Sequence, residues 1–199
     1  MKVYGITGGA GTGKSEVIRI LRDELGGYVI LTDDVARALQ QKGQICYRLM
    51  VAHFGEGILG EDGEIDRPGL AAIVFSDAEQ LAVLNSLTHP YVREEVLRQL
   101  DQARAAGYAF AAVESAILLE AGYGDICDEF WYVYTDPEIR RQRMKETRGY
   151  SDEKVDQVMK NQKPDAVFFE SCDFVITNNS TLEEVRRQLI EKLSVEKDN

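Results

Sequence analysis

Short apolar runs alternate with longer amphipathic segments along the chain. Five short, mostly apolar runs of four to six residues are predicted as strands: Val3–Thr7, Tyr28–Leu31, Tyr108–Val113, Phe130–Tyr134 and Asp173–Ile176. Between them, apolar residues recur at helical spacing over Ser15–Leu25, Asp33–Gln41, the segment that begins at Asp136-Pro137-Glu138, and Thr181–Leu193. This alternation predicts an α/β fold in which helices flank a parallel sheet.

The segment between the second and third predicted strands is too long for a single crossover. It contains a turn-rich stretch over Gly55–Gly63, and then Arg67–Ala106 is almost wholly helical in pattern, with a predicted break at His89-Pro90. We therefore expect a helical lobe at about residues 43–106, inserted into one domain. The core of that domain is expected to comprise residues 1–42, 107–137 and 164–195, and the tail at 196–199 is expected to fray.

The first predicted strand leads directly into a glycine-rich motif. Gly8-Gly9-Ala10-Gly11-Thr12-Gly13-Lys14-Ser15 fits the phosphate-loop pattern G-x-x-x-x-G-K-[ST], between a strand and a helix as the pattern requires. Glycines let backbone N–H groups turn toward phosphate oxygens, and the next helix contributes its positive N-terminus. Lys14 can bridge the β- and γ-phosphates, and Ser15 can supply an oxygen to Mg²⁺. The residues predicted to bind the nucleotide are Gly9, Ala10, Gly11, Thr12, Gly13, Lys14 and Ser15, together with position 16, which is Glu16.

Composition narrows the set of partners. The formal net charge of −11 argues against nucleic acid or an anionic membrane as the main partner, because both require a basic face. No apolar run approaches the ~18–20 residues that span a bilayer. The three cysteines are widely spaced and form no C-x-x-C, which favours a reducing cytoplasm. We expect a cytoplasmic protein that acts on a small molecule.

Three classes of nucleotide-binding protein compete: a small-molecule kinase, a GTPase switch and an ATPase that drives a partner. The chain has no Asn-Lys-x-Asp for guanine recognition. A motor-type ATPase normally has a strand that ends in Asp, whereas the third predicted strand here is followed by Glu114. A small kinase needs an acid near the acceptor hydroxyl and a basic lid over the transferred phosphate, and the chain offers candidates for both.

The candidate acid is Asp33 or Asp34, which follow the second predicted strand. Ligands of parallel sheets bind outside the carboxyl ends of the strands, so an Asp there can accept the proton of an attacking hydroxyl. Alternatively, one of the two caps the helix that follows.

The candidate lid is the segment 138–163, which carries eight cations against five carboxylates. The cations are Arg140, Arg141, Arg143, Lys145, Arg148, Lys154, Lys160 and Lys163. Concentrated positive charge can stabilise a transferring phosphoryl group; the alternative is a solvated pair of charged helices. On the first helix, Arg140 and Arg143 share one face and Arg141 and Lys145 share another, so only one pair can face the phosphate.

Taken in order, these segments resemble the dephospho-coenzyme A kinase family over about residues 3–193. Asp33-Asp34-Val35-Ala36-Arg37 is similar to its Asp-x-x-Ala-Arg segment, and Leu87-Thr88-His89-Pro90 to its Leu-x-His-Pro. Further segments that match are Ile6–Ser15, His53-Phe54-Gly55, Asp62–Arg67 with Leu70, Ile73-Val74-Phe75, Leu118-Leu119-Glu120, the lid residues Arg143, Arg148 and Gln162, and Cys172–Asn179 near the adenine. The chain departs from the family pattern at Leu31, Ala116, Phe168 and Ser180.

The resemblance implies transfer of the γ-phosphate of ATP, with Mg²⁺, to the ribose 3′-hydroxyl of dephospho-coenzyme A. It implies that Asp33 is the base, that Lys14 and Arg143 stabilise the phosphates, and that Arg67 and His89 lie on the acceptor side. Arg140 then becomes the predicted neighbour of Arg143 in the site, and the face that bears Arg141 and Lys145 is predicted to be solvated. A kinase of another small hydroxyl acceptor, and an ATPase or switch, remain alternatives.

Overall fold

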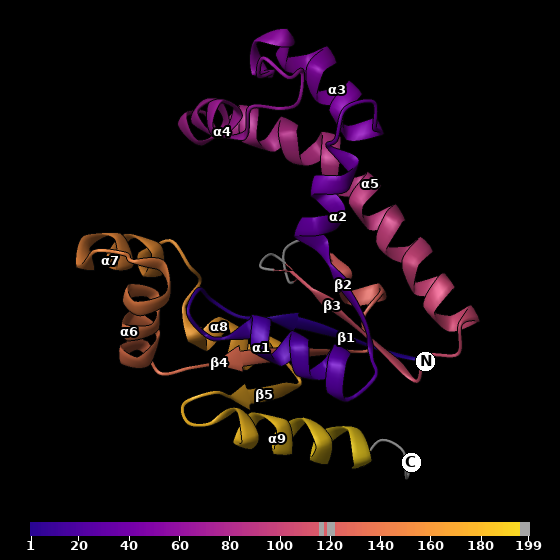
Figure 1. Ribbon diagram of the computed structural model, residues 1–199, viewed down its shortest axis with the longest axis vertical. Coiled ribbons are helices and arrows are strands. Elements are labelled where there is room, and N and C mark those ends of the chain that lie inside the picture. Colours follow the sequence, from indigo (N-terminus) through magenta and orange to yellow (C-terminus); the bar gives the residue numbers. More distant parts are fainter. Residues whose placement is uncertain (116–117, 119–121, 196–199) are drawn as a thin grey trace. The chain divides into compact units, whose positions relative to one another are not determined.

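The computed structural model describes residues 1–115, 118 and 122–195 and contains a five-stranded sheet (Figure 1). The strands are β1 (Lys2–Thr7), β2 (Tyr28–Leu31), β3 (Phe110–Glu114), β4 (Glu129–Tyr134) and β5 (Phe174–Thr177), in the order β2-β3-β1-β4-β5. The pairs β1–β3, β1–β4 and β4–β5 are parallel. Each predicted strand lies within two residues of an observed one, and the predicted α/β class is confirmed.

The chain forms two compact units. One, the sheet unit, comprises Met1–Ile30 and the described part of Ala103–Asn199; the other, the helical unit, is Leu31–Gln102. The predicted helical insertion at 43–106 falls almost entirely in the second unit, which also includes the preceding residues from Leu31.

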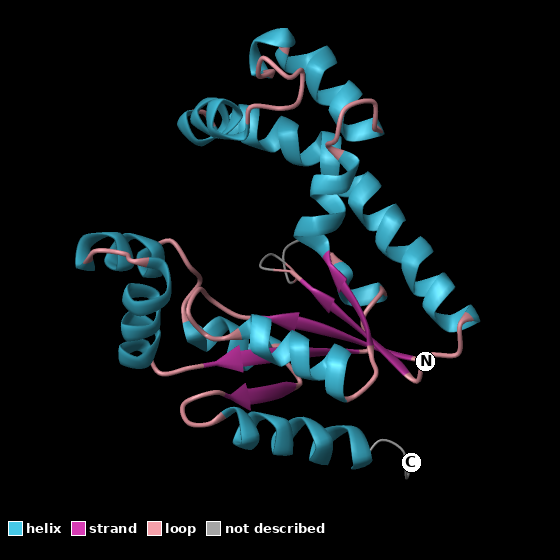
Figure 2. Cartoon of the chain, viewed as in Figure 1, coloured by secondary structure: helices cyan, strands magenta, loops and turns pink. Residues whose placement is uncertain are grey.

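Helices and short turns connect the strands of the sheet unit (Figure 2). They are α1 (Lys14–Arg19), the π-helical turn η1 (Ile20–Glu24), the 3₁₀ turn η3 (Tyr123–Asp125), α6 (Pro137–Arg148), α7 (Asp152–Lys160), α8 (Asp165–Ser171) and α9 (Leu182–Val195). Helix α9 contacts β5 and α1, and α8 contacts β4. The ring of Tyr4 on β1 stacks on Trp131 of β4 with a centroid distance of 4.2 Å. Both side chains are almost completely buried, as expected where both faces of a parallel sheet are covered.

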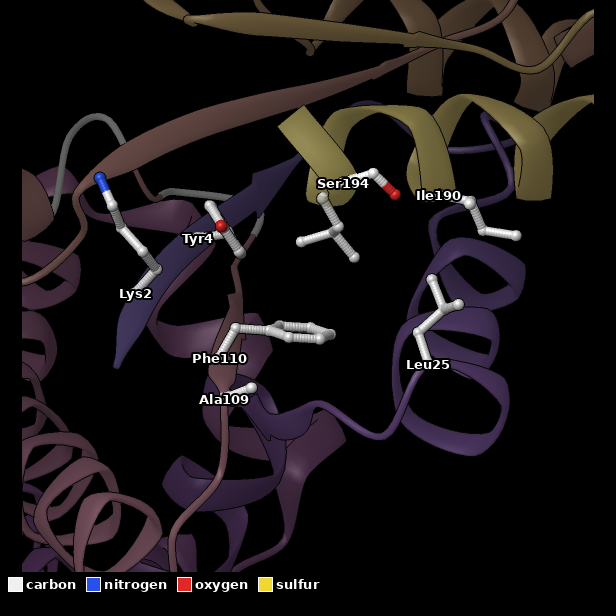
Figure 3. A pocket seen from close by; sticks show the side chains of 8 residues that line it. Lys2, Tyr4, Leu25, Ala109, Phe110, Ile190 and Ser194 are labelled. Atoms are coloured by element: carbon white, nitrogen blue, oxygen red, sulfur yellow. The ribbon is translucent and has the colours of Figure 1, made fainter. Parts of the chain in front are cut away.

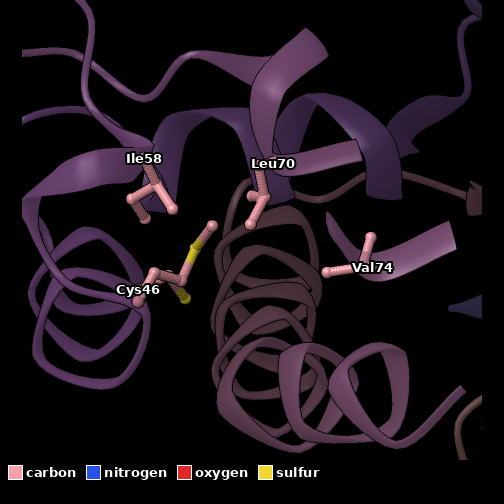
Figure 4. Close-up of a cluster of buried hydrophobic side chains, with 5 residues drawn as sticks. Cys46, Ile58, Leu70 and Val74 are labelled. Atoms are coloured by element: carbon pink, nitrogen blue, oxygen red, sulfur yellow. The ribbon is translucent and has the colours of Figure 1, made fainter. Parts of the chain in front are cut away.

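The helical unit has a small core of its own. Its elements are α2 (Thr32–Leu39), α3 (Ile45–Phe54), the 3₁₀ turn η2 (Glu56–Ile58), α4 (Arg67–Ser76) and most of α5 (Ala78–Ala105). Buried side chains from α3, η2 and α4 meet in one cluster (Figure 4): Cys46, Met50, Ile58, Leu70 and Val74. No helix that the structure describes is long and apolar enough to cross a membrane.

The break predicted at His89-Pro90 is wrong. Helix α5 continues through Pro90, and the helical stretch is interrupted instead at Asp77, where the carboxylate accepts hydrogen bonds from the backbone N–H groups of Glu79 (2.8 Å) and Gln80 (3.3 Å). An Asp before a helix satisfies free N–H groups of the first turn and so favours a new start there. A proline inside a helix removes one hydrogen bond and bends it, which tertiary packing can compensate; Tyr91, next to Pro90, packs against the buried cluster.

One apolar cavity of about 230 Å³ lies at the amino ends of β1 and β3, beside α9 (Figure 3). It is lined by Lys2, Tyr4, Leu25, Ala109, Phe110, Ile190, Leu193 and Ser194. Lys2 is the one charged residue in this lining. Parallel sheets bind ligands at the carboxyl ends of their strands, so we expect the functional site at the end of the sheet opposite this cavity.

Candidate active site

The glycine-rich loop leaves the carboxyl end of β1 at Thr7 and enters α1 at Lys14. Gly11 (φ 78°) and Gly13 (φ 84°) have backbone angles in the left-handed region, which glycine adopts at the least cost. A Cβ on Gly13 would collide with the amide of Asn178, and a Cβ on Gly9 would collide with the guanidinium of Arg140. The loop therefore requires glycine both for its turn and for close packing.

Side chains hold the carbonyl groups on one side of this loop. The hydroxyl of Thr12 donates to the carbonyl of Gly9 (2.9 Å), and Nε of Arg140 donates to the carbonyl of Ala10 (3.1 Å). In a planar trans peptide, the N–H of the next residue points away from the preceding C=O. These two hydrogen bonds therefore direct the N–H groups of Ala10 and Gly11 away from the side chains that hold the carbonyls.

A second pair of side chains holds the last turn of the loop. The hydroxyl of Thr135 (3.0 Å) and Nδ2 of Asn178 (2.8 Å) both donate to the carbonyl of Thr12, which directs the N–H of Gly13 in the same manner. The side chain of Thr12 is fully buried. Of the predicted binding residues, Thr12 thus offers its backbone and not its hydroxyl to a ligand. Thr135 was not predicted; the polar residue at the end of the β4 strand is the signal that could have found it.

Lys14 lies over the start of the loop. Its Nζ donates to the carbonyl of Gly8 (2.5 Å) and of Gly9 (3.3 Å), and it lies 3.9 Å from the carboxylate of Glu114. Glu114 is the last residue of β3, which neighbours β1 in the sheet. In the sequence, Glu114 counts only against a motor-type ATPase, and its position beside Lys14 was not predicted. The signal that could have predicted it is an acid at the end of a strand that neighbours β1.

A cavity of about 540 Å³ opens beside the loop and contains several of the predicted residues. It is lined by Gly11, Gly13, Ser15, Glu16, Arg143, Thr147, Arg148, Asn178, Ser180 and Leu182. Its size is in the range of small-molecule pockets. Two guanidinium groups and the N-terminus of α1 make it suitable for an anion. Glu16 lines it too, but its carboxylate accepts from Nε of Arg19 (2.9 Å).

Arg143 and Arg140 lie one turn apart on α6 and have different surroundings. Nη1 of Arg143 is 3.5 Å from the hydroxyl of Thr135, and a Cβ on Gly13 would lie 3.5 Å from the same nitrogen, so Arg143 reaches the loop from the cavity. Arg140 is buried beneath the loop, bonded to the carbonyl of Ala10, and does not line the cavity. The prediction that Arg140 is a neighbour of Arg143 in the site is therefore wrong.

The second face of α6 binds α7. Arg141 donates to Asp156 (2.5 Å), and Lys145 donates to Asp152 (2.8 Å). The hydrogen bond from Lys145 lowers the pKa of Asp152. The prediction of a merely solvated face is corrected: these side chains are partly exposed, but their charges join the two helices of the candidate lid.

In the helical unit, Asp33 and Asp34 lie in the first turn of α2. The N-cap of α2 is Leu31, so neither carboxylate occupies the capping position, and that alternative for the pair is wrong. Asp34 accepts from Nη1 of Arg37 (3.3 Å). Asp33 is exposed, and its carboxylate has no hydrogen bond or ion pair with the residues that the structure describes. Of the two acids, Asp33 is therefore the one without a partner among the described residues.

Two further predicted residues belong to the same unit. Nη1 of Arg67, at the start of α4, donates to Oε1 of Gln40 (2.8 Å). His89 lies within α5, where burial lowers its pKa. A neutral imidazole can act as hydrogen-bond donor and acceptor at once.

The described positions that depart from the family pattern lie in three different environments. Phe168 is buried and stacks on Tyr132 with a centroid distance of 4.8 Å, so it replaces a charge with ring packing. Ser180 lines the cavity beside the loop, and Leu31 ends β2. Ala116, Leu119 and Glu120 lie outside the described residues.

The family model described as dephospho-CoA kinase matches residues 2–184. The dephospho-CoA kinase of Geobacillus kaustophilus (strain HTA426) is 40% identical over 186 residues, covering 94% of this chain and 92% of the relative. TT1252 from Thermus thermophilus superimposes with a TM-score of 0.83 at 29% identity, covering 97% of this chain and 96% of that structure. Dephospho-CoA kinase from Campylobacter jejuni does so with a TM-score of 0.71 at 25% identity, covering 98% and 96%. The match of the family model over residues 2–184 and the 40% identity to a curated relative show that this chain belongs to the dephospho-CoA kinase family.

Proposed function

We propose that this chain transfers the γ-phosphoryl group of ATP to the ribose 3′-hydroxyl of dephospho-coenzyme A. The observation that carries the proposal is the geometry of the phosphate loop. Hydrogen bonds to the carbonyls of Gly9, Ala10 and Thr12 orient the N–H groups of the residues that follow them. Arg143 and Arg148 line the cavity beside this loop. Family membership supplies the acceptor: the relatives from Geobacillus kaustophilus and Campylobacter jejuni are named dephospho-CoA kinases.

The loop would bind the phosphates of ATP through the backbone N–H groups of Ala10, Gly11 and Gly13, which follow the held carbonyls. Because these groups are already oriented, little reorganisation accompanies binding, and the same donors can stabilise charge as it develops. Lys14 would leave the carbonyl of Gly8 and move onto the β- and γ-oxygens, with Glu114 3.9 Å from its ammonium group to limit the movement.

The residues around the loop fit a magnesium ion. Ser15 presents a hydroxyl in the first turn of α1 and lines the cavity, and Glu114 places a carboxylate near Lys14. Oxygen ligands of this kind, with phosphate oxygens and water, are what Mg²⁺ prefers. Ser15 would hold the ion directly and Glu114 through water. When bound, Mg²⁺ neutralises charge on the β- and γ-phosphates.

Asp33 would orient the acceptor and take its proton. As the 3′-oxygen bonds to the γ-phosphorus, the bond from that phosphorus to the bridging oxygen breaks and ADP leaves; the hydroxyl proton passes to the Asp33 carboxylate. The carboxylate is exposed and free of partners among the described residues, so no existing hydrogen bond must break before it accepts the hydroxyl. Arg67 and His89 would contact the acceptor from the same unit.

Arg143, with Arg148, would stabilise the transferring group when the lid closes. Helix α6 ends at Arg148, and Gly149 follows in a left-handed conformation (φ 63°) between α6 and α7. Such a residue gives the segment a place to bend. Exclusion of water then strengthens the attraction between the guanidinium groups and the phosphoryl oxygens.

The test is ADP release in a coupled assay, with mass spectrometry of the product, using dephospho-coenzyme A against a panel of nucleosides, nucleoside monophosphates and shikimate. We expect turnover with dephospho-coenzyme A and formation of coenzyme A. Faster turnover of another acceptor would indicate a diverged kinase. ADP release that is independent of every acceptor would indicate an ATPase or switch.

A further inference from the structure

We propose that Arg140 is a positioning residue that sets the direction of the Gly11 N–H toward the nucleotide phosphates and ties the loop to the far end of the lid. Its guanidinium is the cation beneath the loop, and its side chain is only 5% exposed. The proposal rests on the proposed function only in taking ATP as the ligand of the loop.

All three guanidinium nitrogens of Arg140 have a partner. Nε donates to the carbonyl of Ala10 (3.1 Å), Nη1 lies 3.4 Å from Oδ1 of Asp165, and Nη2 donates to Oε1 of Gln162. A buried cation is tolerated when it is paired and its donors are satisfied. The planar fork of an arginine can serve three acceptors at once, which a lysine with a single nitrogen cannot do in the same geometry.

The bond to Ala10 acts on the next peptide N–H. Ala10 and Gly11 share a planar trans peptide, so a carbonyl held on the Arg140 side leaves the Gly11 N–H pointing to the opposite side. Gly11 lines the cavity beside the loop. Glycine neighbours leave this peptide free to rotate, so without the guanidinium the loop would populate several orientations and bind phosphate less tightly.

The other two partners come from the segment that follows α7. Gln162 lies between α7 and α8, and Asp165 is the first residue of α8. Asp165 also accepts from the hydroxyl of Tyr132 on β4 (2.7 Å). Burial and this hydrogen bond raise the pKa of Tyr132, so its hydroxyl remains a donor. Arg140, near the start of α6, thereby joins the phosphate loop to the segment that follows α7.

The test compares Arg140→Met and Arg140→Lys with a matched control, Arg141→Met. Arg141 is adjacent on α6, also forms an ion pair, and lies neither in the cavity nor against the loop. The measurements are the Kd for MgATP by calorimetry without acceptor, the ¹H–¹⁵N shift of the Gly11 amide, the KM for dephospho-coenzyme A, and Tm.

We expect Arg140→Met to weaken MgATP binding by about 10-fold, equivalent to about 1.4 kcal/mol, and to shift the Gly11 amide. The KM for dephospho-coenzyme A should change less than about twofold, because the acceptor residues lie in the other unit. Arg140→Lys should give an intermediate Kd, and Arg141→Met should leave Kd and the Gly11 shift unchanged whatever its Tm. A purely structural role would lower Tm without moving Kd or the Gly11 shift of the folded protein.

The proposal is overturned if folded Arg140→Met binds MgATP within twofold of wild type, or if both Met variants behave alike. If Arg140→Met does not fold, Arg140→Lys and Gln162→Met decide: wild-type affinity and an unmoved Gly11 amide in both would overturn it. MgATP binding is measured without acceptor. Failure of the wild type to phosphorylate dephospho-coenzyme A would therefore contradict the proposed function but would not decide the role of Arg140.

Discussion

The phosphate loop and the candidate acceptor acid represent two ways of preparing a functional group. In the loop, the carbonyls of Ala10 and Thr12 are held by side chains that are themselves buried. Asp33 is exposed at the start of a helix, with no partner among the described residues. The loop is preorganised by the protein, whereas the acid is left open to be oriented by its substrate.

The difference follows from what each group must do. Backbone N–H groups are weak donors that gain strength from fixed orientation, since no free energy is then used to align them during the reaction. A carboxylate that must accept a proton from an incoming hydroxyl would be hindered by an existing hydrogen bond. Asp34 illustrates the contrast, because its carboxylate already accepts from Arg37.

The largest expected effect is at Lys14, the loop residue whose charge is to move to the phosphates. Lys14→Ala should lower kcat by about 10³-fold or more, because it removes a cation from the charge that develops on the γ-phosphoryl group. Tm should change little, since Lys14 contributes charge to the loop rather than packing, and its ammonium donates to the backbone carbonyls of Gly8 and Gly9. Steady-state kinetics and thermal unfolding provide the check; a variant with more than half of the wild-type kcat would contradict the assignment of the loop.

Asp33→Asn tests the role of the exposed acid in this comparison. We expect kcat to fall about 10³-fold, within the range for loss of a general base, while the Kd for MgATP measured by calorimetry stays the same. The neighbouring Asp34→Asn is the control and should retain most of the activity. If Asp34→Asn were the inactive variant, the base would be the paired acid, and the contrast between an open acid and a held loop would fail.

Arg143→Ala should reduce kcat by about 10²–10³-fold, as for loss of a donor that acts mainly in the transition state. Lys145→Ala, on the face of α6 that binds α7, should change kcat by less than about twofold. Parallel kinetics of the two variants separate a cation aimed at the loop from one that joins two helices. Equal small effects would show that the positive charge of α6 is not used in transfer.

The smallest expected effect is on stability. Asp34→Ala should lower the free energy of unfolding by about 0.2–0.5 kcal/mol, because it removes an exposed i,i+3 pair with Arg37. Urea denaturation measures this change. A loss of about 1 kcal/mol or more would indicate a capping contribution, which the position of Leu31 as N-cap argues against.

Local signals in the sequence located most elements, and their failures have a physical cause. The strands and the phosphate loop were predictable because periodicity and glycine requirements act over a few neighbouring residues. The break in the long helix was misplaced because proline is a strong local signal, whereas the interruption at Asp77 arises from a carboxylate that satisfies two N–H groups. Helix α5 continues through Pro90, beside which Tyr91 packs against the buried cluster, a contact that sequence spacing does not reveal.

Arg140 and Arg143 show what the sequence alone could not predict about the site. Their spacing predicted that both share one face of α6, and the positive charge of the segment 138–163 predicted a lid for the phosphates beside the glycine-rich loop. The family resemblance selected Arg143, but only the tertiary structure decided that Arg140 does not line the cavity with it. The guanidinium of Arg140 bonds to Gln162, Asp165 and the carbonyl of Ala10, which are distant from it in the chain. Arg143, one turn later on α6, lines the cavity instead. A buried arginine and a ligand-binding arginine have the same local pattern, and they are distinguished by the acceptors that the fold brings to each of them.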